Sequence, residues 1–175
     1  AYFFLGWAFG GAGPPPAPDV PKDKYPLLGE RYKHHYTVHQ NDISLFTGVL
    51  PMLHQLKSRQ HFLAVATGKS RRGLDETLAR EELQGLFHAS RTADETAGKP
   101  HPLMLQELMA EFGVPPERLL MIGDTTHDLL MARNAGCPSV GVSYGAHDHA
   151  DFVALSPLFV AHSVAELQQW LLAHG

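Results

Sequence analysis

The segment Gly123-Asp124-Thr125-Thr126-His127-Asp128 holds the most specific arrangement of reactive side chains in this 175-residue chain. It follows the apolar run 119–122, which is typical of a strand buried on both faces. The spacing places Asp124 in a strand-end loop and Asp128 one turn into the next helix. Two carboxylates that face one crevice suit a hard, oxygen-seeking cation such as Mg²⁺. The alternative is that Asp124 or Thr125 caps the helix and that Asp128 is solvated.

A second polar cluster, Thr67-Gly68-Lys69-Ser70, follows another short apolar run. A hydroxyl, a glycine that exposes backbone N–H groups and a helix start together form a competent phosphate site, so Thr67 and Gly68 are candidate phosphate ligands. A nucleotide-binding P-loop needs a glycine where Leu63 stands, which excludes that class of loop. The alternative is that Thr67 and Ser70 only cap the next helix.

Lys99 is the third candidate, at the threshold of a helix in Lys99-Pro100-His101-Pro102. The prolines on either side of His101 restrict the backbone, so the lysine leaves a rigid turn. A lysine fixed in this way is well placed to neutralise a phosphoryl group. Taken alone, it is equally a solubilising surface charge, and it gains meaning only from the other two clusters.

The elements that must position these residues alternate along the chain. Strands are predicted at 61–66, 119–122, 138–142 and 158–160, with a short extended piece at 87–92. Helices are predicted at 24–39, 48–58, 71–83, 101–112 and 126–135, and a last one begins at Ser163 with Glu166 in a capping box. This alternation predicts an α/β fold with a doubly wound parallel sheet. Ligands bind such sheets beyond the carboxyl ends of the strands, where all three clusters lie.

Composition limits the classes of partner. Apolar residues make up 44% of the chain and charged residues 18%, and 14 basic minus 18 acidic side chains give a net charge of −4. With no basic excess, we expect no nucleic-acid partner. The single cysteine, Cys137, cannot form an internal disulfide, which agrees with a cytoplasmic location. The sequence leaves the oligomeric state open.

The first 18 residues carry no charge, and they pass from an aromatic stretch into runs of glycine and proline. The apolar part is shorter than the roughly 20 residues of a membrane span, so we expect no membrane association. A secretory signal requires basic residues ahead of its apolar core, and no basic residue precedes Lys22, so we expect no such signal. We therefore expect this segment to be the cut end of a larger protein.

Taken in chain order, Thr67, Lys99 and the pair Asp124 and Asp128 resemble the second, third and fourth motifs of the haloacid dehalogenase-like hydrolases. Within that superfamily the sequence resembles the phosphoglycolate phosphatase-like branch, which carries a helical cap. The resemblance covers residues 24–175. It implies a Rossmann-type core at 44–175 and a partial helical cap at 1–43.

The resemblance also implies an activity: Mg²⁺-dependent hydrolysis of a small phosphorylated metabolite through a phosphoaspartyl intermediate. Thr67, Gly68 and Lys99 would bind the phosphoryl group, Thr67 and Lys99 would stabilise it during transfer, and Asp124 would contact the metal with Asp128 in support. Positioning and electrostatics account for most of such catalysis.

The first motif of the family, an apolar strand that ends in Asp-x-Asp-Gly-Thr, is absent ahead of the first core strand. Asp19, Asp23 and Asp42 neither follow an apolar strand nor precede Gly-Thr. We therefore expect the first strand and half the cap to be missing, and the chain as it stands to be inactive. Three other outcomes are open: the flanking strands close on each other, another chain inserts a strand, or the aromatic stretch Tyr2 to Phe9 fills the central position. The alternative function is a non-catalytic phosphate- or partner-binding domain on the same fold.

Overall fold

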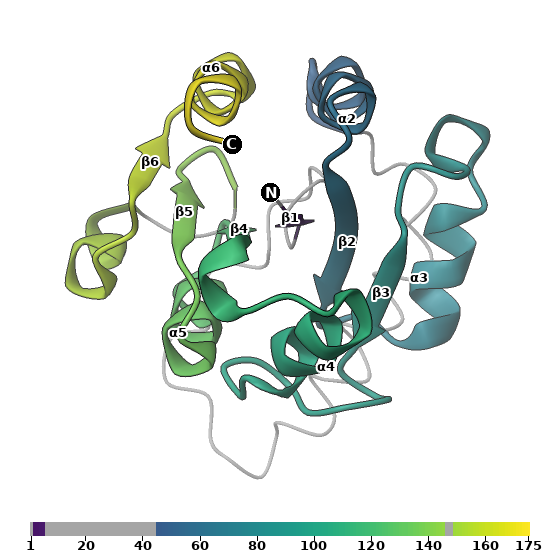
Figure 1. Ribbon diagram of the computed structural model, residues 1–175, viewed down its shortest axis with the longest axis horizontal. Coiled ribbons are helices and arrows are strands. Elements are labelled where there is room, and N and C mark those ends of the chain that lie inside the picture. Colours follow the sequence, from purple (N-terminus) through teal and green to yellow (C-terminus); the bar gives the residue numbers. More distant parts are fainter. Residues whose placement is uncertain (1, 6–44, 146–148) are drawn as a thin grey trace, which may run out of the picture.

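The computed structural model describes residues 2–5, 45–145 and 149–175. A six-stranded sheet with the order β3-β2-β1-β4-β5-β6 forms its centre (Figure 1), and every neighbouring pair of strands is parallel. The strands are β1 Tyr2–Leu5, β2 Phe62–Thr67, β3 Ala89–Thr92, β4 Leu119–Gly123, β5 Ser139–Val142 and β6 Phe159–Ala161. The predicted doubly wound α/β class is confirmed.

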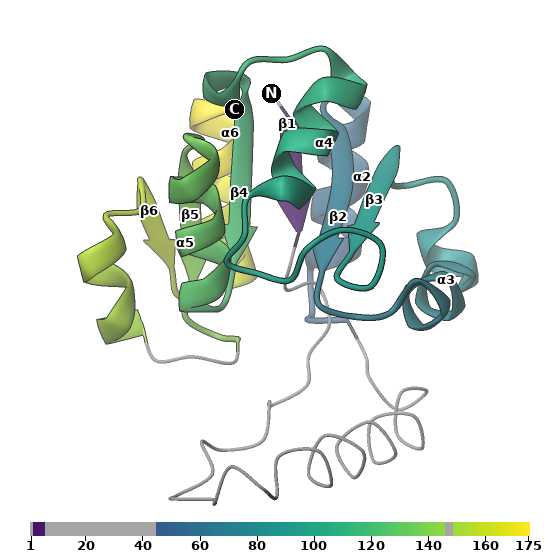
Figure 2. The same ribbon diagram turned by 90° about the horizontal axis from the view of Figure 1, so that it is seen from below.

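Helices cover both faces of this sheet. They are α2 Val49–Ser58, α3 Arg71–Leu78, α4 Leu103–Phe112, α5 Thr126–Ala135 and α6 Val164–His174, with short 3₁₀ helices at Glu81–Leu83, Pro116–Arg118 and His149–Leu155. Figures 1 and 2 show α2 and α6 on one face, α4 and α5 on the opposite face, and α3 beside the edge strand β3. This three-layer arrangement leaves the ends of the strands as the places where loops meet.

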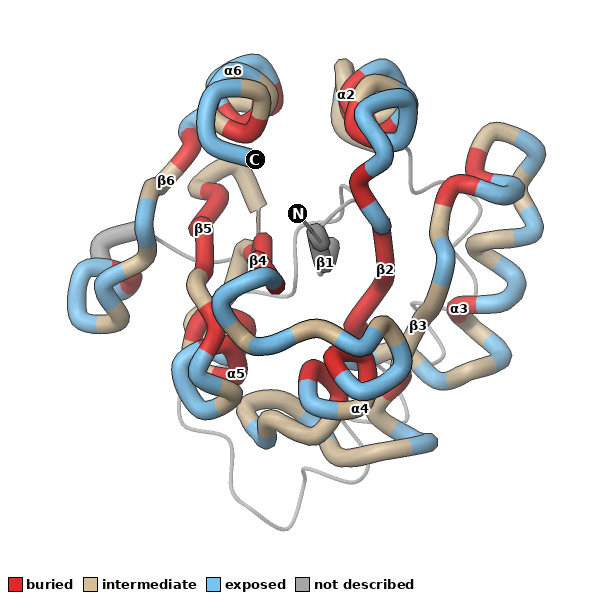
Figure 3. Tube along the Cα trace, in the orientation of Figure 1, coloured by how far each residue is buried: buried red, intermediate tan, exposed pale blue. Residues whose placement is uncertain are grey.

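Alternation of side chains along the strands divides the core in two. Leu120 and Ile122 of β4 join the buried cluster that contains α2 and α6, whereas Leu119 and Met121 join the cluster that contains α4 and α5. Successive side chains of a strand point to opposite faces, so a strand covered on both sides must be apolar throughout. Figure 3 shows the result as continuous buried stretches in β2, β4 and β5.

The boundaries agree with the predicted ones to within a few residues, with two informative differences. Helix α3 ends at Leu78 instead of residue 83, because Arg80 is extended and Leu83 then turns into the cluster that contains α2. Ser163 caps α6 as predicted, but the Glu166 carboxylate accepts the N–H of His162, one residue before the cap. The predicted helix at 24–39 lies outside the described residues.

The expectation that the first strand is missing is wrong. Tyr2–Leu5 forms β1 and pairs in parallel with both neighbours, Tyr2 opposite Phe62 of β2 and Leu5 opposite Ile122 of β4. Aromatic and apolar residues have high β-propensity, and the strand satisfies two long backbone edges that would otherwise stay unpaired. Residues 2–5 therefore belong to the core sheet and not to the partial cap expected at 1–43. Residues 1 and 6–44 lie outside the described residues.

Within the part of the chain that the structure describes, no helix has the length and apolar character needed to cross a membrane.

Candidate functional site

The candidate residues gather at the carboxyl edge of the sheet. Thr67 is the last residue of β2 and Gly123 the last of β4, and the carboxyl end of β1 at Leu5 lies between them. Because all strands are parallel, the loops that carry Thr67, Lys99 and Asp124 start or end at this one edge. It is the position at which doubly wound sheets bind ligands.

The Thr67 loop is arranged to offer hydrogen-bond donors. Thr67 is 9% exposed, and its hydroxyl oxygen accepts the N–H of Lys69 at 3.2 Å, so its own hydrogen remains for an acceptor beyond the strand. Among the described residues, no atom lies within 4 Å of a Cβ built on Gly68, so packing against them does not require a glycine there. Open space beside a strand-end glycine fits a ligand that approaches the backbone closely.

The capping alternative for this loop holds for Ser70 and not for Thr67. Ser70 is the N-cap of α3, and its hydroxyl accepts the N–H of Gly73 at 3.3 Å. Lys69 turns back along the same helix and donates to the Thr77 hydroxyl at 3.0 Å. Burial, and then the charge of Arg80, lower the pKa of Lys69. The loop thus divides its polar groups between the helix start and the sheet edge.

Lys99 and Asp128 form an ion pair across the edge of the sheet. The Lys99 side chain is 13% exposed and that of Asp128 is 1% exposed. The other carboxylate oxygen of Asp128 accepts the N–H of Thr125 at 3.2 Å and its hydroxyl at 2.7 Å. Asp128 is therefore not solvated, and each of its oxygens already has a donor from the protein.

Thr125 and Asp128 also build a complete capping box at the start of α5. The Thr125 hydroxyl accepts the N–H of Asp128 at 3.2 Å, and the Asp128 carboxylate accepts the N–H of Thr125. The Asp128 side chain thus caps the start of the helix and also compensates the charge of Lys99. The alternative that Thr125 caps the helix is confirmed, whereas its second half, a solvated Asp128, is wrong.

Gly123 is required by the close approach of Asp128. A Cβ at this position would lie 2.2 Å from the Cβ of Asp128, far inside van der Waals contact. The glycine at position 123 therefore has a packing reason: it leaves room for Asp128, whose carboxylate binds Lys99.

Asp124 is packed against the loop that follows β5. A Cβ on Gly145 would lie 2.1 Å from the Cβ of Asp124 and 2.4 Å from one carboxylate oxygen. Burial raises the pKa of Tyr144, and the negative charges of Asp124 and then Glu166 raise it further. The Tyr144 hydroxyl therefore stays protonated at neutral pH.

The described residues fit Mg²⁺ as a partial ligand set. No group of three or more histidine, cysteine, aspartate or glutamate side chains in the described ranges is placed to hold a metal. Asp128 is engaged by Lys99 and Thr125, and Asp124 is the residue predicted to contact the metal. Magnesium often takes one or two carboxylates and completes its octahedron with water and substrate phosphate, so one such residue is compatible with it.

Sequence reasoning missed two parts of this site. One is Gly145, whose contact with Asp124 joins two loops. The other is the contact of Arg71 with the loop after β3, through a backbone hydrogen bond to Asp94 and an ion pair with Glu95. Neither had a local signal, because each contact joins segments about 20 residues apart that only the sheet brings together.

Comparison with known proteins places the chain in a family. A family model described as haloacid dehalogenase-like hydrolase matches residues 18–142. The phosphoglycolate phosphatase of Mannheimia succiniciproducens is 32% identical over 142 residues, which are 80% of this chain and 63% of that protein. A probable phosphatase of Dickeya dadantii, IndB, is 36% identical over 124 residues, 70% of this chain and 54% of that protein. The chain thus spans somewhat more than half the length of these relatives.

The fold has a close counterpart among solved structures. A haloacid dehalogenase-like family protein from Streptococcus pneumoniae superimposes with a TM-score of 0.80 at 20% identity, and the match covers 97% of this chain and 96% of that one. At this identity the likeness supports the fold and nothing finer.

Proposed function

Because the chain belongs to the haloacid dehalogenase-like hydrolase family, we propose that it carries the phosphate-binding half of a phosphatase site for a small phosphorylated metabolite. The observation that supports this most is the pairing of Lys99 with the buried Asp128 at the strand edge shared with Thr67. The phosphoglycolate phosphatases among its relatives favour a small substrate.

Each group has a distinct task in binding. The Thr67 hydroxyl and the backbone N–H groups at Gly68 donate to phosphoryl oxygens. The Lys99 ammonium has three hydrogens, of which one serves Asp128, so the others remain for the phosphoryl group. Asp128 holds the ammonium in place, and Thr125 in turn fixes Asp128. Donors held in place before the ligand arrives lose little entropy on binding. Positioning together with electrostatic stabilisation accounts for most of the catalysis in phosphoryl transfer.

Mg²⁺ would be held by Asp124, with Asp128 behind it, and when bound would supply positive charge to the phosphoryl oxygens. The contact of Gly145 with Asp124 restricts where that carboxylate can lie.

Turnover in the family passes through a phosphoaspartyl intermediate, which needs a nucleophilic aspartate after the first strand. In this sequence Gly6, Trp7 and Ala8 follow β1, and the first carboxylate of the chain is Asp19. We therefore expect the 175-residue chain to bind phosphate without hydrolysing an ester. The same observation favours a second candidate function, a dedicated non-catalytic phosphate-binding domain.

The test combines binding with activity. Inorganic phosphate is titrated into the wild-type chain by calorimetry, and release of phosphate from p-nitrophenyl phosphate and phosphoglycolate is measured with and without Mg²⁺. We expect binding that weakens in Thr67→Val and Lys99→Met, and no hydrolysis. Absence of phosphate binding would refute the site, and hydrolysis by the wild-type chain would refute the expected inactivity.

A gain-of-function variant separates the two candidate functions. Gly6→Asp combined with Ala8→Asp restores Asp-x-Asp directly after β1. If the chain keeps the rest of a phosphatase site, Mg²⁺-dependent hydrolysis appears in this variant and is lost again when Lys99→Met is added. A variant that binds phosphate but remains inactive favours the non-catalytic domain.

A further inference from the structure

An ion-pair group outside the predicted motifs joins two of the loops that carry them. Arg71 is the first residue of α3 and stands four residues after Thr67. Its backbone N–H donates to both carboxylate oxygens of Asp94, at 2.9 and 3.1 Å. Asp94 lies in the loop after β3 and five residues before Lys99. A residue of the Lys99 loop therefore accepts the first N–H of the helix that begins at the Thr67 loop, beside the N-cap Ser70.

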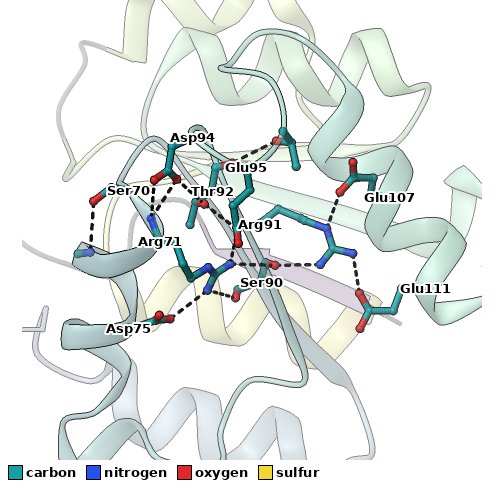
Figure 4. Close-up of polar contacts among 12 residues, drawn as sticks. Ser70, Arg71, Asp75, Ser90, Arg91, Thr92, Asp94, Glu95, Glu107 and Glu111 are labelled. Carbon is teal, nitrogen blue, oxygen red and sulfur yellow. Dashed lines mark hydrogen bonds and ion pairs between the residues drawn. The ribbon is translucent and has the colours of Figure 1, made fainter.

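The side chain of Arg71 strengthens the same connection (Figure 4). Its guanidinium donates to Glu95 at 2.7 Å, to the Ser90 hydroxyl at 2.9 Å and to Asp75 at 3.1 Å. Glu95 is the neighbour of Asp94 in the loop after β3. The arginine thus reaches α3, β3 and the Lys99 loop with one planar group, which offers several donors in a fixed geometry.

Buried Thr92 anchors both carboxylates to the sheet. It is the last residue of β3 and fully buried, and its hydroxyl lies 2.7 Å from both Asp94 and Glu95. On the sheet, Thr92 is paired with Thr67 at the end of β2. The hydrogen bond to Thr92, followed by that to the Arg71 backbone, lowers the pKa of Asp94, so the carboxylate is ionised throughout the neutral range.

The far side of the Lys99 loop is fixed as well. Arg91 of β3 donates to Glu107 at 2.6 Å and to Glu111 at 2.8 Å, and both glutamates lie on α4, the helix that follows Lys99. Figure 4 shows these contacts of Arg91 with Glu107 and Glu111. The segment between β3 and α4 is therefore fixed on the N-terminal side of Lys99 by Asp94 and Glu95, and on its C-terminal side by α4.

We propose that Arg71, Asp94 and Glu95 are positioning residues that lock the Thr67 loop to the Lys99 loop, so that the two meet the same phosphate. This inference rests on the proposed phosphate site and adds to it the residues that hold its two halves together. A binding site loses affinity when its donors are displaced by even an ångström, so the lock should be measurable in phosphate binding.

Asp94→Asn gives the decisive test because a positioning role and a purely electrostatic role predict opposite changes in phosphate affinity. Removing a negative charge near an anion site strengthens anion binding if only electrostatics acts. If Asp94 positions the loops, phosphate binding instead weakens, by about tenfold. The matched control is Glu76→Gln, which removes one negative charge from α3, where Glu76 forms an ion pair with the 89% exposed Arg72. We expect no loss of affinity in that control.

A second comparison separates positioning from general loss of stability. Binding of inorganic phosphate is measured by calorimetry, well below the melting temperature of every variant, for Asp94→Asn, Lys99→Met and the double variant. If Asp94 acts by placing Lys99, then Asp94→Asn weakens phosphate binding by less than about threefold in the Lys99→Met background. Equal effects of Asp94→Asn in both backgrounds, or an affinity that is unchanged or tighter in Asp94→Asn, overturn the inference. Wild-type protein that binds no phosphate, or Lys99→Met that binds normally, overturns the proposed function itself.

Discussion

Asp128→Asn is the substitution for which the structure defines a cost most clearly. Asp128 is 1% exposed and accepts from the Lys99 ammonium, the Thr125 N–H and the Thr125 hydroxyl. Asparagine keeps the shape but has one carbonyl oxygen, so its amide group must face either Lys99 or Thr125 as a second donor. One set of donors is then left without its acceptor.

The magnitude follows from the burial of the pair. Breaking a buried ion pair from one side costs about 3–5 kcal/mol, because the remaining charge is uncompensated. Lys99 keeps 13% exposure, which places the expected loss at the lower end, about 3 kcal/mol. For a domain of this size, 1 kcal/mol shifts the melting temperature by about 2–4 °C, so we expect a fall of roughly 6–12 °C.

The assay is a double-mutant cycle by urea unfolding on wild type, Asp128→Asn, Lys99→Met and the double variant. The double variant should lose less unfolding free energy than the two single variants added together, by a coupling energy of about 1–3 kcal/mol. The exposed pair of Arg72 and Glu76, with side chains 89% and 42% exposed, is the control and should couple by about 0.3–0.5 kcal/mol. Additive losses in the Lys99 and Asp128 cycle would refute the claim that these two residues stabilise each other as a buried ion pair.

Three further outcomes are expected. Gly145→Ala puts a Cβ 2.1 Å from that of Asp124, so Mg²⁺ binding measured by calorimetry should weaken roughly 10–100-fold, and an unchanged affinity would exclude Asp124 as the ligand. Cys137 is 7% exposed and burial raises its pKa to about 12, so Ellman's reagent at pH 8 should label it only after unfolding; rapid labelling of the folded protein contradicts this burial. Hydrogen bonds from Arg71 and then Thr92 lower the pKa of Glu95, and hydrogen bonds from Thr92 and then the Arg71 backbone lower the pKa of Asp94. Both ionised carboxylates therefore stabilise the fold above the ordinary carboxyl pKa of about 4. This stabilisation is lost as the pH falls through their lowered pKa values. The melting-temperature gap between wild type and the Asp94→Asn, Glu95→Gln variant should therefore narrow below about pH 4, and a gap that stays constant down to pH 2.5 argues against these contacts.

The elements that carry the site were predictable because their signals are local. Buried parallel strands are apolar on both faces, which marks β2, β4 and β5 in the sequence. Helix α5 was predicted with its true bounds, since Thr126–Ala135 is closed by Gly136 in a left-handed conformation that favours glycine. Chain order then placed Thr67, Lys99 and Asp124 at the correct ends of these elements.

The first strand shows where such reasoning stops. Tyr2–Leu5 has the composition of a strand, but the family motif that should follow the first strand is absent, and that absence predicts a missing strand. Pairing with β2 and β4 decides the outcome, because four residues that satisfy two backbone edges gain hydrogen bonds on both sides.

By itself, the sequence determined the α/β class, the positions of most strands and helices, and the residue types at the strand ends, because each depends on neighbours within one element. The tertiary structure decided what those residues do to one another: that Asp128 is buried against Lys99, that Gly123 and Gly145 leave room for the two aspartates, and that Asp94 accepts the first N–H of the helix after Thr67. Contacts between loops have no periodicity along the chain. They arise only when the parallel sheet brings the carboxyl ends of its strands to one edge.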